Sequence, residues 1–302
     1  MRRQYLASFV YRAAKAREGF SAASEHDGIS ESPTVTINTG GLKSVFMFGT
    51  TPFNPPHATN VINDKWALYQ AVEGHVLRPQ TEAILKTDPR GDAEILEQLT
   101  GHVADSAHSL DFPFVLKPNS GSLSKNVFIA NTPEEALSAI SAIRKDPSCG
   151  DYLLAQQYLG DAHSAFPEIR AMCLDGECLI MYERTIDQAD EANAAIWGGE
   201  TIRGIDDPSI RAQVENLARH LHQIHDMSYI GLDLKVDRGG HIWLIEGNSS
   251  PMGLEKVRQQ LPDGDALISG LTSRMLDKLQ MHANSVEQTN ALFDSIRGIE
   301  VT

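Results

Sequence analysis

Residues 229–253, YIGLDLKVDRGGHIWLIEGNSSPMG, contain the pattern that decides the fold of this chain. Apolar residues alternate along residues 230–236, which predicts a strand with one buried face. The Asp-Arg-Gly-Gly sequence at 237–240 is typical of a tight turn, and a second strand-like run follows it. The sequence therefore predicts a two-stranded antiparallel hairpin.

The polar face of this hairpin carries three oxygen-bearing side chains. If Val236 pairs with His241, the diagonal neighbour of Asp233 on the same face is Glu246, and Asn248 follows Glu246 on that face. Two carboxylates this close repel each other unless a cation lies between them. Oxygen ligands favour a hard cation such as Mg²⁺. The alternative, a solvated hairpin with a polar outer face, stays open at this point.

A second candidate site is the small-residue loop PNSGSLSKN at residues 118–126. Small residues allow backbone N–H groups to approach a phosphate closely. Lys117 ends the preceding strand-like run and would place a positive charge beside that phosphate. The loop lacks the GxxxxGKS/T pattern of a Walker P-loop. An ordinary hairpin loop is the alternative interpretation.

Composition limits the classes of function. The chain has 302 residues, of which 41% are hydrophobic and 22% charged, as in ordinary globular proteins. Its net charge of −14 argues against nucleic-acid binding, and no run of about 18 apolar residues predicts a membrane span. Three cysteines without a CxxC pattern predict a reducing, cytoplasmic location. Residues 1–20 are basic; we interpret them as a surface helix, with an organelle-targeting segment as the minority interpretation.

The order of predicted elements indicates an α+β fold, because antiparallel hairpins alternate with helices. The clearest helix is 208–225, capped by Asp207, and the clearest second hairpin is 168–184, which turns at Asp175 and Gly176. We predict three parts: a small N-terminal domain at 1–60, a central subdomain at 61–155 and a C-terminal subdomain at 156–302.

Five segments occur in an order that resembles a known family. They are NDK at 63–65, FPFVLKPNSGSLSKNV at 112–127, LLAQQYL at 153–159, PEIRAMCLDGE at 167–177 and the hairpin at 231–251. Together they resemble the ATP-grasp superfamily over about residues 60–276, in particular its carboxylate–amine ligases. The chain is most similar to ribosomal-protein glutamate ligases and more distantly to D-alanine–D-alanine ligase. The resemblance implies two α+β subdomains that bind ATP between them.

The resemblance also implies a role for each matching residue. The predicted phosphate-binding residues are Lys65, Lys117, Gly121, Ser122 and Ser124. The predicted adenine- and ribose-binding residues are Gln156, Gln157, Leu159 and Glu168. Arg170 and Arg184 match catalytic arginines near the phosphates and the substrate carboxylate. Asp233, Glu246 and Asn248 match ligands of Mg²⁺, for which two ions are expected and Mn²⁺ is an alternative.

The implied activity is an ATP-dependent ligase that forms an amide through an acyl phosphate and releases ADP and phosphate. Its partners would be ATP, a small carboxylate and an amine of an amino acid, a peptide or a protein terminus. Neither nucleic acid nor a membrane is expected as a partner, and a homo-oligomer is possible. The alternatives are a non-catalytic ATP-binding module and a kinase on the same fold; a kinase would phosphorylate a hydroxyl without needing an amine.

The chain departs from these ligases where a substrate-binding arginine is usual. Trp197 stands at that place, and Arg203 is a hypothetical substitute for the missing charge. His220, His222 and His225 are not predicted as a metal site, because their spacing does not bring all three to one face of a helix.

Overall fold

The structure is a computed structural model and describes residues 5–24, 34–101, 109–121, 125–160, 166–186 and 200–297. The chain forms two compact units, one of Met1–Pro55 with Ser249–Thr302 and one of Pro56–Asn248. The predicted three-part division at residues 60 and 155 stays a prediction. No helix among the described residues is long and apolar enough to cross a membrane.

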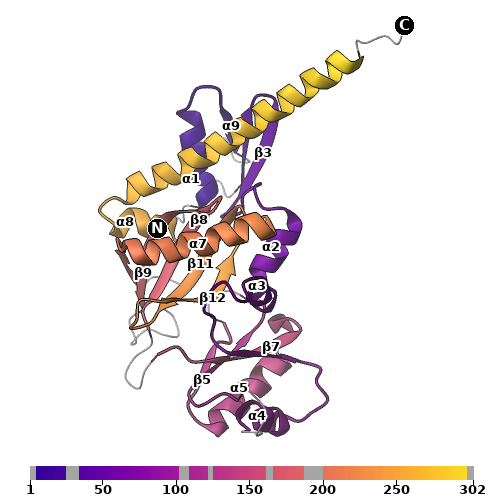
Figure 1. The fold of residues 1–302 in the computed structure, drawn as a ribbon, viewed down its shortest axis with the longest axis vertical. Helices are drawn as coiled ribbons and strands as arrows, with labels where there is room; N and C mark the ends of the chain where they lie inside the picture. The colour runs from indigo at the N-terminus through magenta and orange to yellow at the C-terminus, as the bar shows by residue number, and fades with distance from the viewer. Residues whose placement is uncertain are drawn as a thin grey trace. The chain divides into compact units, whose positions relative to one another are not determined.

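The first unit is built from segments at both ends of the chain. Its strands β1 (Ser21–Ser24), β2 (Thr34–Thr39) and β3 (Leu42–Met47) form an antiparallel sheet in that order. Its helices are α1 (Leu6–Lys15), α8 (Leu254–Gln260) and α9 (Gly264–Arg297). The long α9, yellow in Figure 1, packs against α1 and β2. Leu6, Phe9 and Val10 of α1 are buried, as the apolar spacing predicted.

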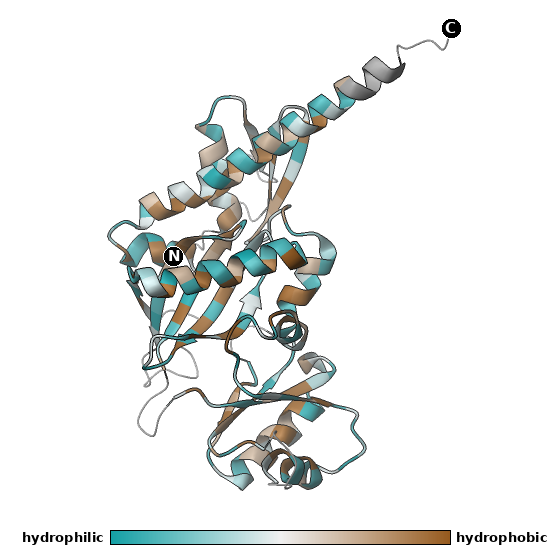
Figure 2. Ribbon diagram, in the orientation of Figure 1, coloured by the Kyte–Doolittle hydropathy of each residue, from teal (hydrophilic) through white to brown (hydrophobic). Residues whose placement is uncertain are grey.

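The second unit contains a five-stranded antiparallel sheet in the order β10-β9-β8-β11-β12. Its strands are β8 (Glu168–Leu174), β9 (Glu177–Ile186), β10 (Glu200–Gly204), β11 (Tyr229–Val236) and β12 (Ile242–Asn248). Helix α7 (Pro208–His225) begins at its predicted cap, Asp207, and packs apolar residues against one face of this sheet. Figure 2 shows both hydrophobic and hydrophilic residues on α7, as an amphipathic helix requires.

A four-stranded antiparallel sheet, β4-β7-β5-β6, lies in the same unit. Its strands are β4 (Thr81–Leu85), β5 (Phe114–Pro118), β6 (Phe128–Ala130) and β7 (Tyr152–Gln157). Helices α4 (Asp92–Thr100) and α5 (Pro133–Lys145) share a hydrophobic core with one face of it. The described part of this unit also contains the short helices α2 (Pro56–Asn63), α3 (Lys65–Ala71) and η1 (Pro147–Cys149).

The predicted register of the β11–β12 hairpin is wrong along its whole length, because Val236 does not pair with His241 and a further shift follows at the candidate metal ligands. Val236 pairs with Ile242 and Leu234 with Leu244, but the register then shifts, so that Asp233 lies directly opposite Glu246. Ile245 is the extra residue and has no partner in this register. A β-bulge of this kind redirects side chains and is not visible in apolar alternation. It replaces the predicted diagonal arrangement with a direct one, which brings the two carboxylates closer.

Candidate active site

One face of the five-stranded sheet is covered by α7, and the candidate residues lie on the other face. Directly paired residues point to the same side of a sheet, and Asp233 pairs with both Arg170 and Glu246. Asn248 pairs with Gly231 and follows Glu246 by two residues, so it shares this face. The structure therefore brings the three predicted metal ligands together on two neighbouring strands.

Asp233 forms a buried ion pair with Arg170. The Nε and Nη2 of Arg170 donate to the two carboxylate oxygens of Asp233 at 2.7 and 2.6 Å. Only 5% of the Asp233 side chain and 13% of the Arg170 side chain are exposed. Burial acts to raise the pKa of Asp233, but the adjacent Arg170 charge and its hydrogen bonds outweigh burial and hold that pKa below its usual value. Asp233 is therefore a carboxylate at neutral pH.

Glu246 faces a lysine that comes from the start of α3. The Nζ of Lys65 lies 3.3 Å from a Glu246 carboxylate oxygen and donates to the carbonyl of Asn119 at 3.4 Å. Asp64 caps α3 by accepting from the backbone N–H of Ala67 at 2.8 Å. The Asn119 amide donates to the other oxygen of Asp64 at 2.8 Å. The helix start is thereby attached to the end of β5, which fixes the position of Lys65 beside Glu246.

Lys117 is the second lysine of the site and is almost completely buried. Its Nζ donates to the side-chain carbonyl of Gln156 on β7 at 2.9 Å. Burial, assisted by the positive charge of Lys65, lowers the pKa of Lys117 to about 8. A buried ammonium is costly unless an anion lies near it, so this position of Lys117 favours the binding of an anionic group.

Arg184 and Glu168 form a further ion pair on the same face, where they are directly paired between β9 and β8. Lys235 of β11 pairs with Glu168 on its other side. The Nζ of Lys235 donates to the carbonyl of Phe166 at 3.0 Å, and burial lowers its pKa to about 8. Positive and negative side chains thus alternate across three strands.

The remaining predicted residues are distributed around this face or lie outside the described residues. The backbone N–H of Gln157 donates to the carbonyl of Gln80 at 2.8 Å, and the carbonyl of Leu159 accepts from Phe166 at 3.2 Å. Gly121 follows β5 and is exposed. Ser122, Ser124 and Trp197 lie outside the described residues.

Sequence reasoning missed three residues of this site. The Tyr69 hydroxyl bonds to Ile245 and Gln156, and the Asn119 amide bonds to Asp64 beside Lys65. Lys235 lies on the charged face. The alternation in 230–236 already places Lys235 two residues after Asp233 on the polar face, so the signal for it was present. Tyr69 and Asn119 carried no comparable signal, because only tertiary contacts connect them to the site.

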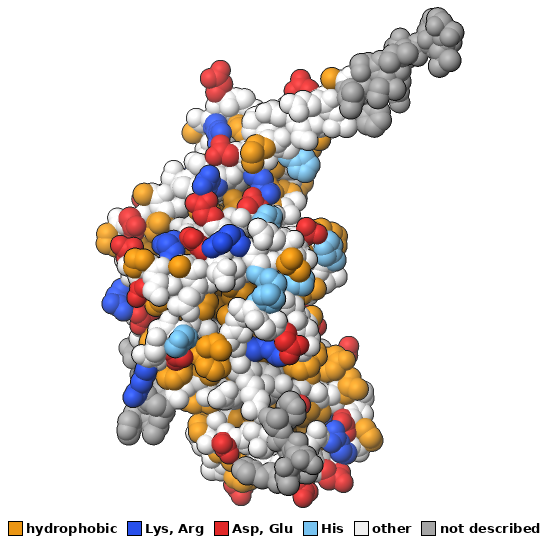
Figure 3. Space-filling view, viewed as in Figure 1, with side chains coloured by type: hydrophobic (Ala, Val, Ile, Leu, Met, Phe, Trp, Pro, Cys, Tyr) orange, Lys and Arg blue, Asp and Glu red, His pale blue; other side chains and the backbone are white. Residues whose placement is uncertain are grey.

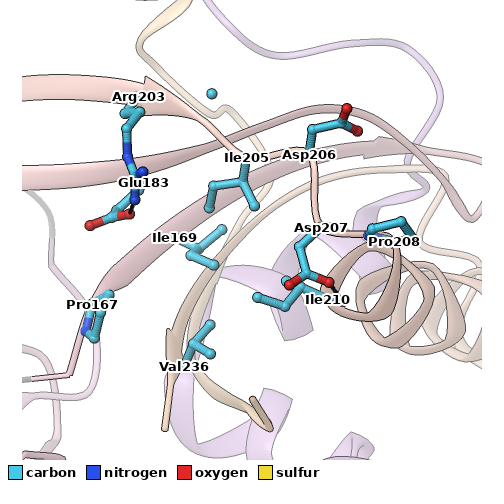
Figure 4. A pocket seen from close by; sticks show the side chains of 11 residues that line it. Pro167, Ile169, Glu183, Arg203, Ile205, Asp206, Asp207, Pro208, Ile210 and Val236 are labelled. Carbon is cyan, nitrogen blue, oxygen red and sulfur yellow. Dashed lines mark hydrogen bonds and ion pairs between the residues drawn. The ribbon is translucent and has the colours of Figure 1, made fainter. Parts of the chain in front are cut away.

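Arg203 does not lie on this face. It pairs with Glu183 in the sheet, and Glu183 pairs with Ile169, which belongs to the core under α7. Arg203 binds Glu183 at 2.5 Å and its side chain is 79% exposed. Figure 4 shows both residues at a separate pocket of about 500 Å³, with Asp206 and Asp207 at the start of α7. The hypothesis that Arg203 replaces an arginine of the substrate site is therefore wrong.

The histidines near the end of α7 form hydrogen bonds with the backbone instead of a metal site. Nε2 of His225 lies 3.0 Å from the carbonyl of Ala71 and that of His220 lies 3.4 Å from the same atom. His75 stacks on His220 with ring centroids 3.6 Å apart. Figure 3 shows histidines on this part of the surface. No group of three His, Cys, Asp or Glu side chains among the described residues is arranged to hold a metal.

Comparisons with known proteins agree with this geometry. A family model described as the RimK-like ATP-grasp domain matches residues 64–265. The D-alanine–D-alanine ligase of Bacillus anthracis complexed with ATP is 17% identical, with a TM-score of 0.55 over 78% of this chain and 71% of that chain. A D-cycloserine synthetase is also 17% identical, with a TM-score of 0.53 over 74% of this chain and 73% of that chain. At this identity the two structures show a shared fold. No curated protein matches the chain.

Proposed function

Because the chain belongs to the RimK-like ATP-grasp family, it is an ATP-dependent carbon–nitrogen ligase, and we propose that it joins a small carboxylate to an amine of an amino acid, a peptide or a protein terminus. One observation carries the proposal. Two buried lysines from separate elements lie near the carboxylates: Lys65 is 3.3 Å from Glu246, and Lys117 lies within electrostatic range of Glu246 and Asp233.

The donor set of the site fits Mg²⁺, which ATP-grasp ligases generally use. Two carboxylates and one amide oxygen are hard ligands, and Glu246 and Asn248 are only partly buried, so solvent and ligands reach them. We propose that Glu246, Asn248 and Asp233 would hold the metal, and that Arg170 orients the Asp233 carboxylate. When bound, the metal neutralises charge on the ATP phosphates. We further propose two ions.

The chain's own residues would then position charge around the transferred phosphoryl group. A substrate carboxylate oxygen attacks the γ-phosphorus and ADP leaves, which gives an acyl phosphate. The amine nitrogen then attacks the acyl carbon, loses a proton and displaces phosphate. We propose that Lys65 and Lys117 neutralise the phosphoryl oxygens and that Arg170 and Arg184 stabilise the oxyanion formed during amine attack.

The roles of the remaining residues follow the same proposal. Gln157, Leu159 and the backbone at the end of β7 would bind adenine, and Glu168 would accept from the ribose hydroxyls while it holds Arg184. Gly121, Ser122 and Ser124 would cover the phosphates. We also propose a cytoplasmic location, on the basis of the three unpaired cysteines and the absence of a predicted disulfide framework.

Amine-dependent ADP release tests this function. The full chain with ATP and Mg²⁺ is incubated with a matrix of amino acids and dipeptides, and ADP is measured for each pair. We expect release with at least one pair and none without an amine. ATP at a hundredfold excess over its Kd should also stabilise the protein by about 2.7 kcal/mol. ATP binding without ADP release from any pair would favour the non-catalytic module, and a stable phosphorylated product without an amine would favour the kinase.

The lowered pKa of Lys117 predicts how activity depends on pH. We expect kcat/KM for ATP to fall as the pH rises above about 8, because the free enzyme then loses the ammonium that binds phosphate. In Lys117→Arg this decline should disappear below pH 10, because a guanidinium stays charged. Lys235→Arg is the matched control, since Lys235 has a similar pKa, and it should keep the decline. If the decline persisted in Lys117→Arg and vanished in Lys235→Arg, the titrating group would be Lys235 instead.

A further inference from the structure

We propose that Tyr69 is a positioning residue for this reaction: its hydroxyl holds the β12 bulge beside Glu246 and, through Gln156, the side chain of Lys117. The inference rests on the proposed function, because it assigns Tyr69 to the placement of the metal and phosphate groups. Tyr69 lies on α3, four residues after Lys65, and its side chain is fully buried.

The first contact is with the bulge. The Tyr69 hydroxyl donates to the carbonyl of Ile245 at 2.6 Å. Ile245 is the residue that the bulge inserts between the pairs Asp233–Glu246 and Leu234–Leu244. A bulged residue leaves the regular ladder, so its carbonyl needs a partner outside the strand pair. The Ile245 carbonyl is partly buried, which limits its access to water. Tyr69 supplies that partner and thereby stabilises the register in which Glu246 faces Asp233.

The second contact fixes the orientation of the Gln156 amide. Its Nε2 donates to the Tyr69 oxygen at 2.6 Å and to the Thr81 hydroxyl oxygen at 3.0 Å. Both oxygens have already donated their own hydrogens, Tyr69 to Ile245 and Thr81 to the carbonyl of Pro79 at 2.8 Å. They can therefore only accept from Gln156. The amide carbonyl must then face the other way, toward Lys117.

The result is a directed chain of hydrogen bonds from Lys117 to Gln156, Tyr69 and Ile245. Burial raises the pKa of the Tyr69 phenol, so the hydroxyl keeps the proton that it donates. The Lys117 ammonium also lies 5.9 Å from the centroid of the Tyr69 ring, within the range of a cation–π contact. Tyr69 thus connects the strand of Glu246 with the lysine of the other sheet.

Tyr69→Phe in the full chain tests this inference, because it removes one oxygen and preserves the ring. We expect kcat for amine-dependent ADP release to fall about tenfold, as for the loss of one or two hydrogen bonds, while KM for ATP rises less, by about fivefold. The reason is that Glu246 and Lys117 interact most strongly with the charge that develops in the transition state, so their displacement lowers kcat more than it weakens ATP binding. Tyr229→Phe is the matched control, a fully buried tyrosine on β11 of the same unit, and should stay within twofold of wild type.

A double-mutant cycle separates positioning from general stability. If Tyr69 acts through Gln156, Tyr69→Phe should lower kcat by less than threefold in a Gln156→Ala background. Thr81→Val removes the other acceptor of the same amide and should lower kcat by about threefold. Full additivity in the cycle, or an unchanged kcat in Tyr69→Phe, would overturn the inference. Should Tyr69→Phe fail to fold, wild-type kcat in both Gln156→Ala and Thr81→Val would overturn it.

Failure of the proposed function has a different signature, since the wild-type protein would then release no ADP with any amine. In that case the role of Tyr69 is tested by measuring the affinity for ATP with and without Mg²⁺. Tyr69→Phe should reduce the gain in ATP affinity from Mg²⁺ at least fivefold, and Tyr229→Phe should not. Equal gains in wild type and Tyr69→Phe would contradict the role of Tyr69 whatever the reaction.

Discussion

Glu246→Gln is expected to lower kcat by about a thousandfold or more, because an amide withdraws a full negative charge from the proposed metal site. A metal ion contributes several kcal/mol to transition-state stabilisation, and about 1.4 kcal/mol corresponds to a tenfold change in rate. The fold should persist, since Glu246 is partly exposed and the backbone of β12 is unchanged. The measurement is amine-dependent ADP release at saturating ATP, together with the melting temperature.

Glu183→Gln is the matched control for this substitution. Glu183 is a glutamate of the same sheet, but it lies on the opposite face and pairs with the exposed Arg203. Its replacement should change kcat less than twofold. A Glu246→Gln protein that kept more than a tenth of wild-type kcat would show that Glu246 does not hold the metal.

Arg170→Met is expected to have the largest effect on stability, lowering the free energy of unfolding by about 3 kcal/mol or more. The substitution leaves the buried Asp233 carboxylate without the cation that holds both its oxygens, and breaking a buried ion pair from one side typically costs about 3–5 kcal/mol. Urea unfolding at pH 7 measures the difference. Arg203→Met is the control, because its ion pair is exposed and should contribute less than about 1 kcal/mol.

The dependence on pH identifies Asp233 as the cause of this loss. In the wild type the pKa of Asp233 lies below its unfolded value of 3.8, so the pair stabilises the fold above about pH 4 and loses this effect as the pH falls further. In Arg170→Met the main pKa-lowering influence is lost, although Arg184 and Glu246 still act, so burial shifts the pKa of Asp233 upward from its wild-type value. The stability difference between the two proteins should therefore shrink as the pH falls from about 7 toward about 4 and shrink further below about pH 4. Replacing both residues, as Arg170→Met with Asp233→Leu, should recover part of the loss.

Local patterns were sufficient to predict much of the fold. The cap at Asp207, the Asp175–Gly176 hairpin and the alternation in β11 each depend on interactions within a few residues, and all three elements form as predicted. The order of the quoted segments was sufficient to identify the ATP-grasp family. The hairpin register was less predictable, since Val236 pairs with Ile242 and not with His241.

The sequence by itself determined that Asp233 lies on the face of β11 opposite Leu232 and Leu234, because side chains alternate along a regular strand, and it identified Glu246 and Asn248 as candidate ligands beside it. Only the tertiary structure decided how they meet. A bulge at Ile245, stabilised by Tyr69 from α3, places Asp233 directly opposite Glu246, and Arg170 occupies both oxygens of Asp233. Those contacts join residues far apart in the chain, and their energies depend on burial, which no local pattern contains.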